Sequence, residues 1–369
     1  MTPNQRFLQD CAEIAADKFN KRRIDRRTFV KATAALGLIP AMKAGKAYAA
    51  TPAQLVHANW GGDGATCTSN IYGATFTAET GIPVVLDGSG PFEGTIKQMV
   101  ETDSTIWDCC DSDVFSGLRL GRADLLTAID YSIVDKNKIL APFTYDYCVL
   151  GYWYSYALTY DTTKVDGVPT WADFFDVEKY EGKRTMYKWM SGAPEAALLA
   201  DGVPMEEIYP LDMDRAMEKI LSIEDHVIYW GSGAESQTMF LDEEVIMGNI
   251  WQTRASVIER DTEGRATWTW DQAIACPAGW VIPGKNPAGA EWGNRWLAHL
   301  QDPELQIQVM DCYGQGPANP AALDLMTPEQ RRLHPAAPEN LEVQLLSDQE
   351  YWAANYDDVL NMFLDNISA

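Results

Sequence analysis

Aromatic and acidic residues follow strand-like segments at two places in the N-terminal third of the sequence. Trp60 ends the first such segment, and the glycine-rich turn after it contains Asp63. Asp113 ends the triplet Asp-Ser-Asp that follows another strand-like segment. Either carboxylate could hold an ammonium group in a charge-assisted hydrogen bond. Either could also simply cap the helix expected after it, which is a common use of aspartate.

The elements expected around these residues alternate between strand and helix. Strand-like segments are bounded by glycine, proline or aspartate, and the segments between them carry apolar residues at helical spacing. Such alternation predicts βαβ units and a parallel sheet, whose ligands lie beyond the carboxyl ends of the strands. Trp60 and Asp113 should therefore share one rim. The expected strands are 55–60, 83–86 and 106–110, and the expected helices are 67–80, 92–102 and 114–126.

A second α/β region follows an aromatic-rich segment at 147–161. Its aromatic and β-branched content favours a strand, and its length suggests that it leaves one domain and enters another. Segments 274–282 and 315–320 are expected to cross back. A chain of this size should divide into two domains.

The N-terminal segment has the order of an export signal. Arg26 and Arg27 stand in the pattern R-R-x-F-V-K, a short apolar run follows, and Ala47-Tyr48-Ala49 fits a cleavage site. The arginine pair indicates the twin-arginine (Tat) export machinery, cleavage near Ala49 and a periplasmic protein. An ordinary amphipathic helix is the alternative. We therefore exclude residues 1–49 from the expected fold.

The composition excludes several classes of partner. The chain has 369 residues and a formal charge of −24. Removal of 1–49 takes 10 of 29 basic and 4 of 53 acidic residues, which leaves 19 and 49 and a charge of −30. Nucleic acids and anionic membrane surfaces need a basic face, so both are poor partners. The remaining chain has no apolar run of the ~20 residues that span a bilayer.

Six cysteines remain after the signal, and an oxidising compartment would allow them to pair. Their sequence positions leave the pairing open. We expect Cys276 with Cys312 first, and we expect Cys109 and Cys110 to be buried thiols in a strand. No spacing matches a zinc site, so the sequence predicts neither a metal nor a cofactor.

Several short motifs, in their order along the chain, resemble the spermidine/putrescine-type periplasmic solute-binding proteins of ABC importers. The likeness covers nearly the whole chain after the signal. The motifs that carry it are Asn59-Trp60, Ile106-Trp107-Asp108, Trp171-Ala172-Asp173-Phe174-Phe175, Tyr180-Glu181-Gly182-Lys183, the segment 243–251 and Trp280-Val281-Ile282-Pro283.

This resemblance implies an α/β fold of type II, with two lobes that close on a ligand about crossover strands. Lobe 1 would comprise 50–155 plus 279–318, and lobe 2 would comprise 156–278 plus 319–369. The implied partners are a small-molecule ligand and the membrane permease subunits of an ABC importer. The protein is expected to be a monomer.

The resemblance also implies which residues line the cleft. Trp60 and Trp251 fall on aromatic positions of the family, and Asp63 lies close to an acidic one. Other positions depart: the expected acidic pair falls on Trp189 and Gly192, another acid falls near Ala278, and Phe115 replaces a polar aromatic residue. The ligand-binding candidates are Trp60, Asp63, Asp113, Trp189, Trp251, Arg254, Trp280 and Gln315.

Arg254, three residues after Trp251, changes the expected ligand. A diammonium compound would lose pairing carboxylates and meet a guanidinium, which is costly in a buried site. A guanidinium suits a carboxylate, which it binds through two parallel hydrogen bonds. The cleft is therefore expected to hold a zwitterion, such as the ω-amino acid γ-aminobutyrate. A true putrescine or spermidine binder is the alternative.

The sequence leaves two other classes of protein as alternatives. A Tat-exported enzyme with a cofactor is one, although His57, His226, His299 and His334 are scattered and the chain has no H-E-x-x-H or G-x-S-x-G motif. An iron-binding relative is the other, and it would need clustered tyrosines. The tyrosines at 145–154 are better explained as packing of the crossover strand.

Overall fold

The computed structural model describes residues 51–189 and 191–367. The expected export signal at 1–49 lies outside the described residues. The strands of the described part form a mixed sheet in the order β2-β1-β3-β9-β5-β8-β6-β7, with β10 beside β5 and with β4 and β11 beside β9. The strands are β1 Leu55–Ala58, β2 Val84–Asp87, β3 Cys109–Asp113, β4 Leu126–Thr127, β5 Val149–Asp161, β6 Arg184–Tyr187, β7 Val227–Trp230, β8 Met247–Trp251, β9 Ala266–Pro283, β10 Gly316–Pro317 and β11 Leu345–Leu346.

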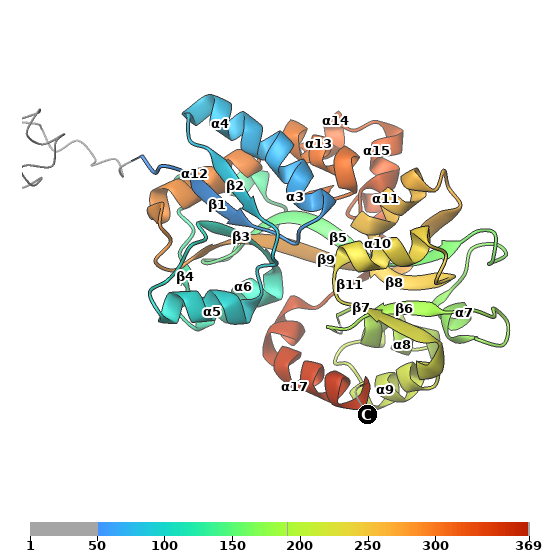
Figure 1. Cartoon of the computed structure of the whole chain (residues 1–369). Helices are drawn as coiled ribbons and strands as arrows, with labels where there is room; N and C mark the ends of the chain where they lie inside the picture. The colour runs from blue at the N-terminus through green and yellow to red at the C-terminus, as the bar shows by residue number, and fades with distance from the viewer. Residues whose placement is uncertain (1–50, 190, 368–369) are drawn as a thin grey trace, which may run out of the picture. The chain divides into compact units, whose positions relative to one another are not determined.

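Helices connect and cover these strands (Figure 1). None among the described residues is long and apolar enough to cross a membrane. They are α3 Asp63–Thr68, the π-helix η1 Ser69–Gly73, α4 Ala74–Thr80, α5 Glu93–Glu101, α6 Val114–Arg122, η2 Lys136–Lys138, α7 Trp171–Phe175, α8 Ala193–Ala200, η3 Met205–Glu207, α9 Met213–Leu221, η4 Glu224–His226, α10 Gly233–Leu241, α11 Gln252–Asp261, α12 Gly289–Leu300, α13 Pro303–Tyr313, α14 Ala322–Leu325, α15 Pro328–Leu333, α16 Pro338–Leu341 and α17 Gln349–Ile367.

Two long strands, β5 and β9, run antiparallel through the middle of the sheet. Every residue of β5 is buried. On one side lie β3, β1 and β2, which we call the first wing. On the other side lie β8, β6 and β7, the second wing. Within the wings, β1 is parallel to β2 and β3, and β6 is parallel to β7 and β8, as the alternation of strands and helices predicts.

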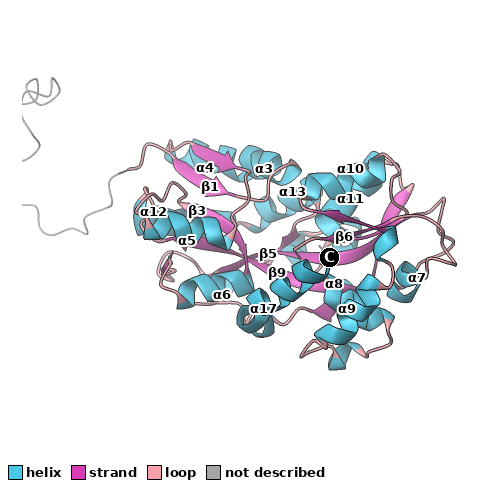
Figure 2. Cartoon of the chain, turned by 60° about the horizontal axis from the view of Figure 1, so that its bottom comes forward, coloured by secondary structure: helices cyan, strands magenta, loops and turns pink. Residues whose placement is uncertain are grey.

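The wings are connected by more than the central strands. In Figure 2 the C-terminal helix α17 lies beside α6 and near α9, and its side chains bond to both sides of the molecule. Arg119 of α6 binds the carboxylate of Asp357 through two contacts of 2.8 Å. On the other side, the indole N–H of Trp352 donates to the buried carboxylate of Glu195 in α8 at 3.0 Å. The proposed lobe boundaries stay a prediction.

Several expected element boundaries differ from the structure. The helix expected at 114–126 ends at Arg122, and Leu126 belongs to β4. The helix expected at 67–80 begins at Asp63 and includes a π-helical turn. It ends as expected at Gly81, whose φ of 74° lies in the left-handed region that favours glycine. The strand expected at 106–110 begins only at Cys109, because Ile106 is exposed and the Trp107 indole donates to Asp87 at 2.7 Å.

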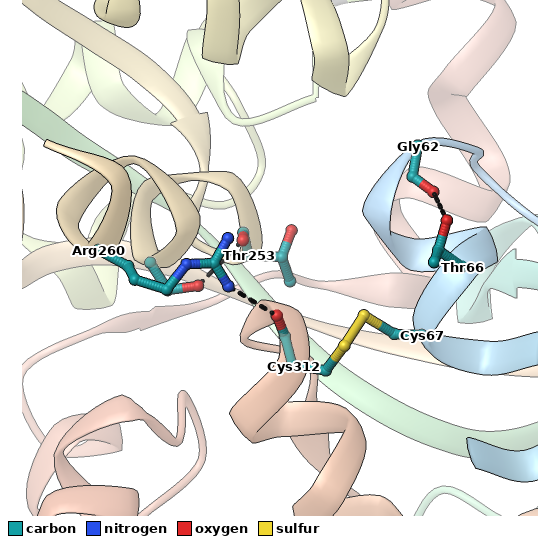
Figure 3. The surroundings of a disulfide bond; sticks show 7 residues. Gly62, Thr66, Cys67, Thr253, Arg260 and Cys312 are labelled. Atoms are coloured by element: carbon teal, nitrogen blue, oxygen red, sulfur yellow. Dashed lines mark hydrogen bonds between the residues drawn. A yellow bond between two sulfur atoms is a disulfide. The ribbon is translucent and has the colours of Figure 1, made fainter. Parts of the chain in front are cut away.

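The expected disulfide is wrong. Cys312 pairs with Cys67, with a Cα–Cα distance of 6.1 Å (Figure 3). The bond joins α3 to the end of α13, two helices that pack together far from β9, which carries Cys276. Cys276 is a buried free thiol instead. Cys109 and Cys110 are buried free thiols, as expected.

Candidate ligand-binding site

A cavity of about 690 Å³ lies where strand ends of the two wings meet. Its walls include the turn after β1, the end of β3, the central strand β5 and the start of α11. Trp60 and Asp113 both line it, together with Asp111 and Ser112. The carboxyl ends of β1 and β3 therefore share one rim, as their parallel pairing requires.

Aromatic rings from both wings meet across this cavity. Trp60 of the first wing lies 6.3 Å from Trp251 of the second wing, measured between ring centroids. Phe92 lies 5.7 Å from Trp60 and 6.3 Å from Trp189, so it extends the row toward the second wing. Such rings offer apolar area to a methylene chain and π-faces to a cation. The row can thus enclose a short aliphatic amine.

Strand β5 supplies a second set of rings through its alternation. Tyr152, Tyr154 and Tyr156 are two residues apart, so they point to the same face, and all three line the cavity. Tyr154 also lies 6.4 Å from Trp251. Sequence reasoning explained these tyrosines only as packing of a crossover strand. The signal that it missed is their spacing of two.

Arg254 is a buried cation without an acidic partner. Its side chain lies near the start of α11, and the residue is only 3 % exposed. Its Nη2 donates to the Gly61 carbonyl at 3.2 Å, while its buried Nε has no partner. Among the described residues, no carboxylate oxygen lies within 4.0 Å of the guanidinium. Burial lowers its pKa, against the smaller opposing effects of Tyr313 and Asp63.

Two glycines leave room for this guanidinium. A Cβ at Gly233, the first residue of α10, would lie 2.3 Å from Arg254 Nε. A Cβ at Gly62 would lie 3.3 Å from Nη1, and the φ of 59° there also disfavours any side chain. The arginine therefore lies between backbone of the first wing and backbone of the second, and it lines the cavity.

Four acidic residues line the cavity, and two of them, Glu93 and Asp357, bind Arg119. The other two are Asp111 and Asp113. Asp113 is buried, and it accepts a hydrogen bond from the Tyr154 hydroxyl at 2.7 Å. Burial raises its pKa to about 6, the Tyr154 bond opposes this, and the charges of Glu93 and Asp111 add to it. Asp111 lies two residues earlier on the same face of β3, and His57 Nε2 lies 3.0 Å from its Oδ1. The cavity thus contains a guanidinium without an acidic partner, that of Arg254, and two carboxylates without a Lys or Arg partner among the described residues, those of Asp111 and Asp113.

Burial of the Asp113 carboxylate should make stability depend on pH. With a folded pKa of about 6 and an ordinary value of 3.8, the folded state holds the proton more tightly than the unfolded state. Stability of the wild type should therefore fall as the pH rises through this window and level off above it. Asp113→Asn, which cannot titrate, should be more stable than wild type at neutral pH by up to about 3 kcal/mol.

Urea unfolding at a series of pH values measures this difference. The advantage of Asp113→Asn should shrink as the pH is lowered from about 7 to about 4. Asp214→Asn, on the exposed first turn of α9, is the control and should follow the wild type. Parallel curves for wild type and Asp113→Asn would contradict the assignment.

Five of the eight predicted ligand-binding residues line the cavity, and three do not. Trp280 is buried, and its ring packs against Gly151, where a Cβ would clash with it. Gln315 is buried just after α13, away from the cavity lining. Asp63 starts α3 and acts on Arg254 only through its charge. The five in the lining are Trp60, Asp113, Trp189, Trp251 and Arg254.

Some of the positions at which the sequence departs from the family pattern line the cavity, and others do not. Phe115 lines the cavity, whereas Ala278 and Gly192 do not. Within the described ranges, no group of three or more His, Cys, Asp or Glu side chains is arranged to hold a metal ion.

The fold and this cavity define a two-lobe solute-binding protein of type II, in which β5 and β9 are the crossover strands. The family model of the bacterial extracellular solute-binding proteins matches residues 72–337. The chain belongs to this family, and it is the substrate-binding component of an ABC transporter. The expected fold class is confirmed.

Three similar proteins are named for a ligand or have a structure with a bound ligand. The γ-aminobutyric acid-binding protein of Pseudomonas aeruginosa is 26 % identical over 83 % of this chain and 88 % of its own length. The solved structure of a GABA receptor is 32 % identical, with a TM-score of 0.77, and covers 85 % of this chain and 97 % of the receptor. A binding protein of Agrobacterium tumefaciens in complex with agropinic acid is 25 % identical, with a TM-score of 0.81 and coverage of 87 % and 100 %.

Proposed function

We propose that this protein captures an ω-amino acid, such as γ-aminobutyrate, and delivers it to the permease of an ABC importer. The observation that carries the proposal is that the guanidinium of Arg254, which has no acidic partner, shares a cavity with the carboxylates of Asp111 and Asp113, which have no Lys or Arg partner among the described residues. A zwitterion would supply the missing charge at both places. Two of the similar proteins are named as a binding protein and a receptor for γ-aminobutyrate, which supports this ligand class.

In this proposal Arg254 binds the ligand carboxylate, and the acidic residues on β3 bind its ammonium group. Trp60 and Trp251 enclose the methylene chain between the charged ends. Two other cations line the cavity, Arg119 and Lys97. Arg119 does not compete for the carboxylate, because it already binds Glu93 at 3.0 Å and Asp357 at 2.8 Å. Lys97 is exposed to solvent, unlike the buried Arg254. A diammonium ligand would instead leave Arg254 without a partner in a dry site, which disfavours polyamines.

The remaining parts of the proposal concern export and movement. The Arg26-Arg27 signal would direct the protein through the twin-arginine route to the periplasm, where it would act as a monomer. The two lobes would close about the crossover strands. We infer a binding role without catalysis, because the named relatives are substrate-binding components of transporters.

A thermal-shift screen tests the ligand class. A ligand that binds only the folded state raises the melting temperature in proportion to the logarithm of its concentration over Kd. We expect γ-aminobutyrate and its close homologues to raise it, and we expect putrescine and spermidine to leave it unchanged. Shifts with putrescine but not with γ-aminobutyrate would overturn the proposal.

A further inference from the structure

A buried chain of hydrogen bonds ends at one carboxylate of the cavity. His57 on β1 is 1 % exposed. The indole Nε1 of Trp296, on α12, donates to His57 Nδ1 at 2.8 Å, and His57 Nε2 lies 3.0 Å from Asp111 Oδ1. The His57 and Trp296 rings meet edge to face at 5.8 Å. Neither of these two residues lines the cavity, but Asp111 does.

The hydrogen-bond partners of His57 determine which ring nitrogen carries its proton. An indole nitrogen can only donate, so Nδ1 must accept and cannot carry a proton. The imidazole proton is then on Nε2, from which it is donated to Asp111. A second proton would put two N–H groups face to face at Nδ1. The ring is therefore held neutral and in one tautomer, and it orients Asp111 without neutralising its charge.

The carboxylate of Asp111 has no cationic partner among the described residues. His57 is the one basic side chain within 4.0 Å of it there, and its Nδ1 accepts the Trp296 N–H instead of carrying a proton. The surrounding phenols, Tyr72, Tyr152 and Tyr313, have pKa values raised well above their ordinary value by burial, so they also stay neutral. A buried carboxylate in such surroundings favours a cationic ligand, because an unpaired buried charge is costly.

We propose that Asp111 is an ammonium anchor of the cavity, and that His57 is a positioning residue which Trp296 holds in the tautomer that orients this anchor. The proposal rests on the proposed function, because it requires a ligand with an ammonium group. Asp111 and Asp113 alternate on one face of β3. An ammonium group has three N–H donors and can therefore bind both carboxylates.

The first test replaces Asp111 with asparagine, which keeps the shape and an oxygen that accepts from His57. Calorimetry should show a loss of γ-aminobutyrate affinity of about 30-fold or more, typical of removing one partner of a buried charge pair. Butyrate, which has the carboxylate but no amine, should bind the variant at least as well as it binds wild type. Unchanged affinity for γ-aminobutyrate would show that Asp111 is only structural. Absence of γ-aminobutyrate binding to the wild type would instead contradict the proposed function.

The second test needs no ligand. Nitrogen NMR of His57 in the ligand-free wild type should show an unprotonated Nδ1 and a protonated Nε2 throughout about pH 5 to 8, the range in which a free histidine would titrate. A proton on Nδ1 at any pH in that range would contradict the tautomer and overturn the role of Trp296.

The third test removes the hydrogen bond that fixes the tautomer of His57. Trp296→Phe removes the N–H that His57 accepts, so the imidazole can take a second proton and become an internal counter-ion for Asp111. Besides the phenols, the titratable groups near Asp111 are Asp113, Cys109 and Cys110, and burial keeps both thiols neutral. His299 stacks on the Trp296 ring at 5.9 Å between ring centroids. Asp113 and His299 are present in both proteins. Affinity for γ-aminobutyrate should then fall more steeply below about pH 7 than in the wild type.

Trp171→Phe is the matched control. Trp171 is also a fully buried tryptophan, and its indole donates one bond, to the Gln272 carbonyl at 2.8 Å, away from the cavity. Both variants should lose stability, but only Trp296→Phe should change the pH profile of binding. Equal pH profiles in the two variants would reduce Trp296 to a packing role and overturn the proposal.

Discussion

Arg254→Ala should weaken γ-aminobutyrate binding by more than about 100-fold, the upper part of the range for removing one partner of a buried charge pair. The ligand carboxylate would lose its counter-charge in a cavity where, among the described residues, no other unpaired cation is placed as deeply. Calorimetric titration measures the loss. The ligand-free variant should keep the stability of the wild type, because the removed guanidinium has no acidic partner and an unsatisfied Nε.

Two variants make this result specific. Arg260→Ala, two turns later on the same helix, removes an exposed arginine that binds Asp261 and the Cys312 carbonyl, and it should leave affinity unchanged. Arg254→Lys keeps the charge but loses the planar pair of donors, so its affinity should lie between wild type and Arg254→Ala. Wild-type affinity in Arg254→Ala would remove the carboxylate site.

Removal of the Cys67–Cys312 disulfide should lower the free energy of unfolding by about 2–5 kcal/mol. The bond closes a loop with a sequence separation of 245 residues, so it restricts the unfolded chain strongly. It also joins α3, which follows Trp60, to the end of α13, which carries Tyr313 of the cavity wall. A Cys67→Ala, Cys312→Ala double variant, unfolded in urea beside the oxidised wild type, measures the difference.

A reductant provides the control for this prediction. It should lower the stability of the wild type toward that of the double variant and leave the variant itself unchanged. Cys109, Cys110, Cys148 and Cys276 are buried free thiols, so reduction has no other bond to break among the described cysteines. Equal unfolding midpoints for oxidised wild type and double variant would contradict the prediction.

Local patterns were enough to predict most elements, but not their arrangement in space. Glycine, proline and aspartate bounded the strands correctly, because backbone conformation decides those positions. The pairing of the cysteines depends instead on helix packing: α3 contacts α13, and no local pattern near Cys67 records that contact. The expected Cys276 pairing was wrong for this reason. The start of β3 was also misplaced, since an exposed Ile106 resembles a buried one in sequence.

The residues of the cavity lining were predictable where topology decides their position. Trp60 and Asp113 were placed correctly because parallel strands end on one rim. The resemblance added Trp251 and Arg254, whose position depends on the order of β8 in the sheet. Tyr154 was missed as a cavity residue. Its spacing of two from Tyr152 and Tyr156 puts the three tyrosines on one face, but a strand buried on both faces does not show which face borders a cavity.

A crystal structure of the protein with bound γ-aminobutyrate tests the central claim most directly. We predict that the ligand carboxylate lies within hydrogen-bond distance of the Arg254 guanidinium, that the methylene chain packs against Trp60 and Trp251, and that the ammonium group contacts Asp111 or Asp113. A ligand bound in the reverse orientation, or bound outside this cavity, would contradict the claim.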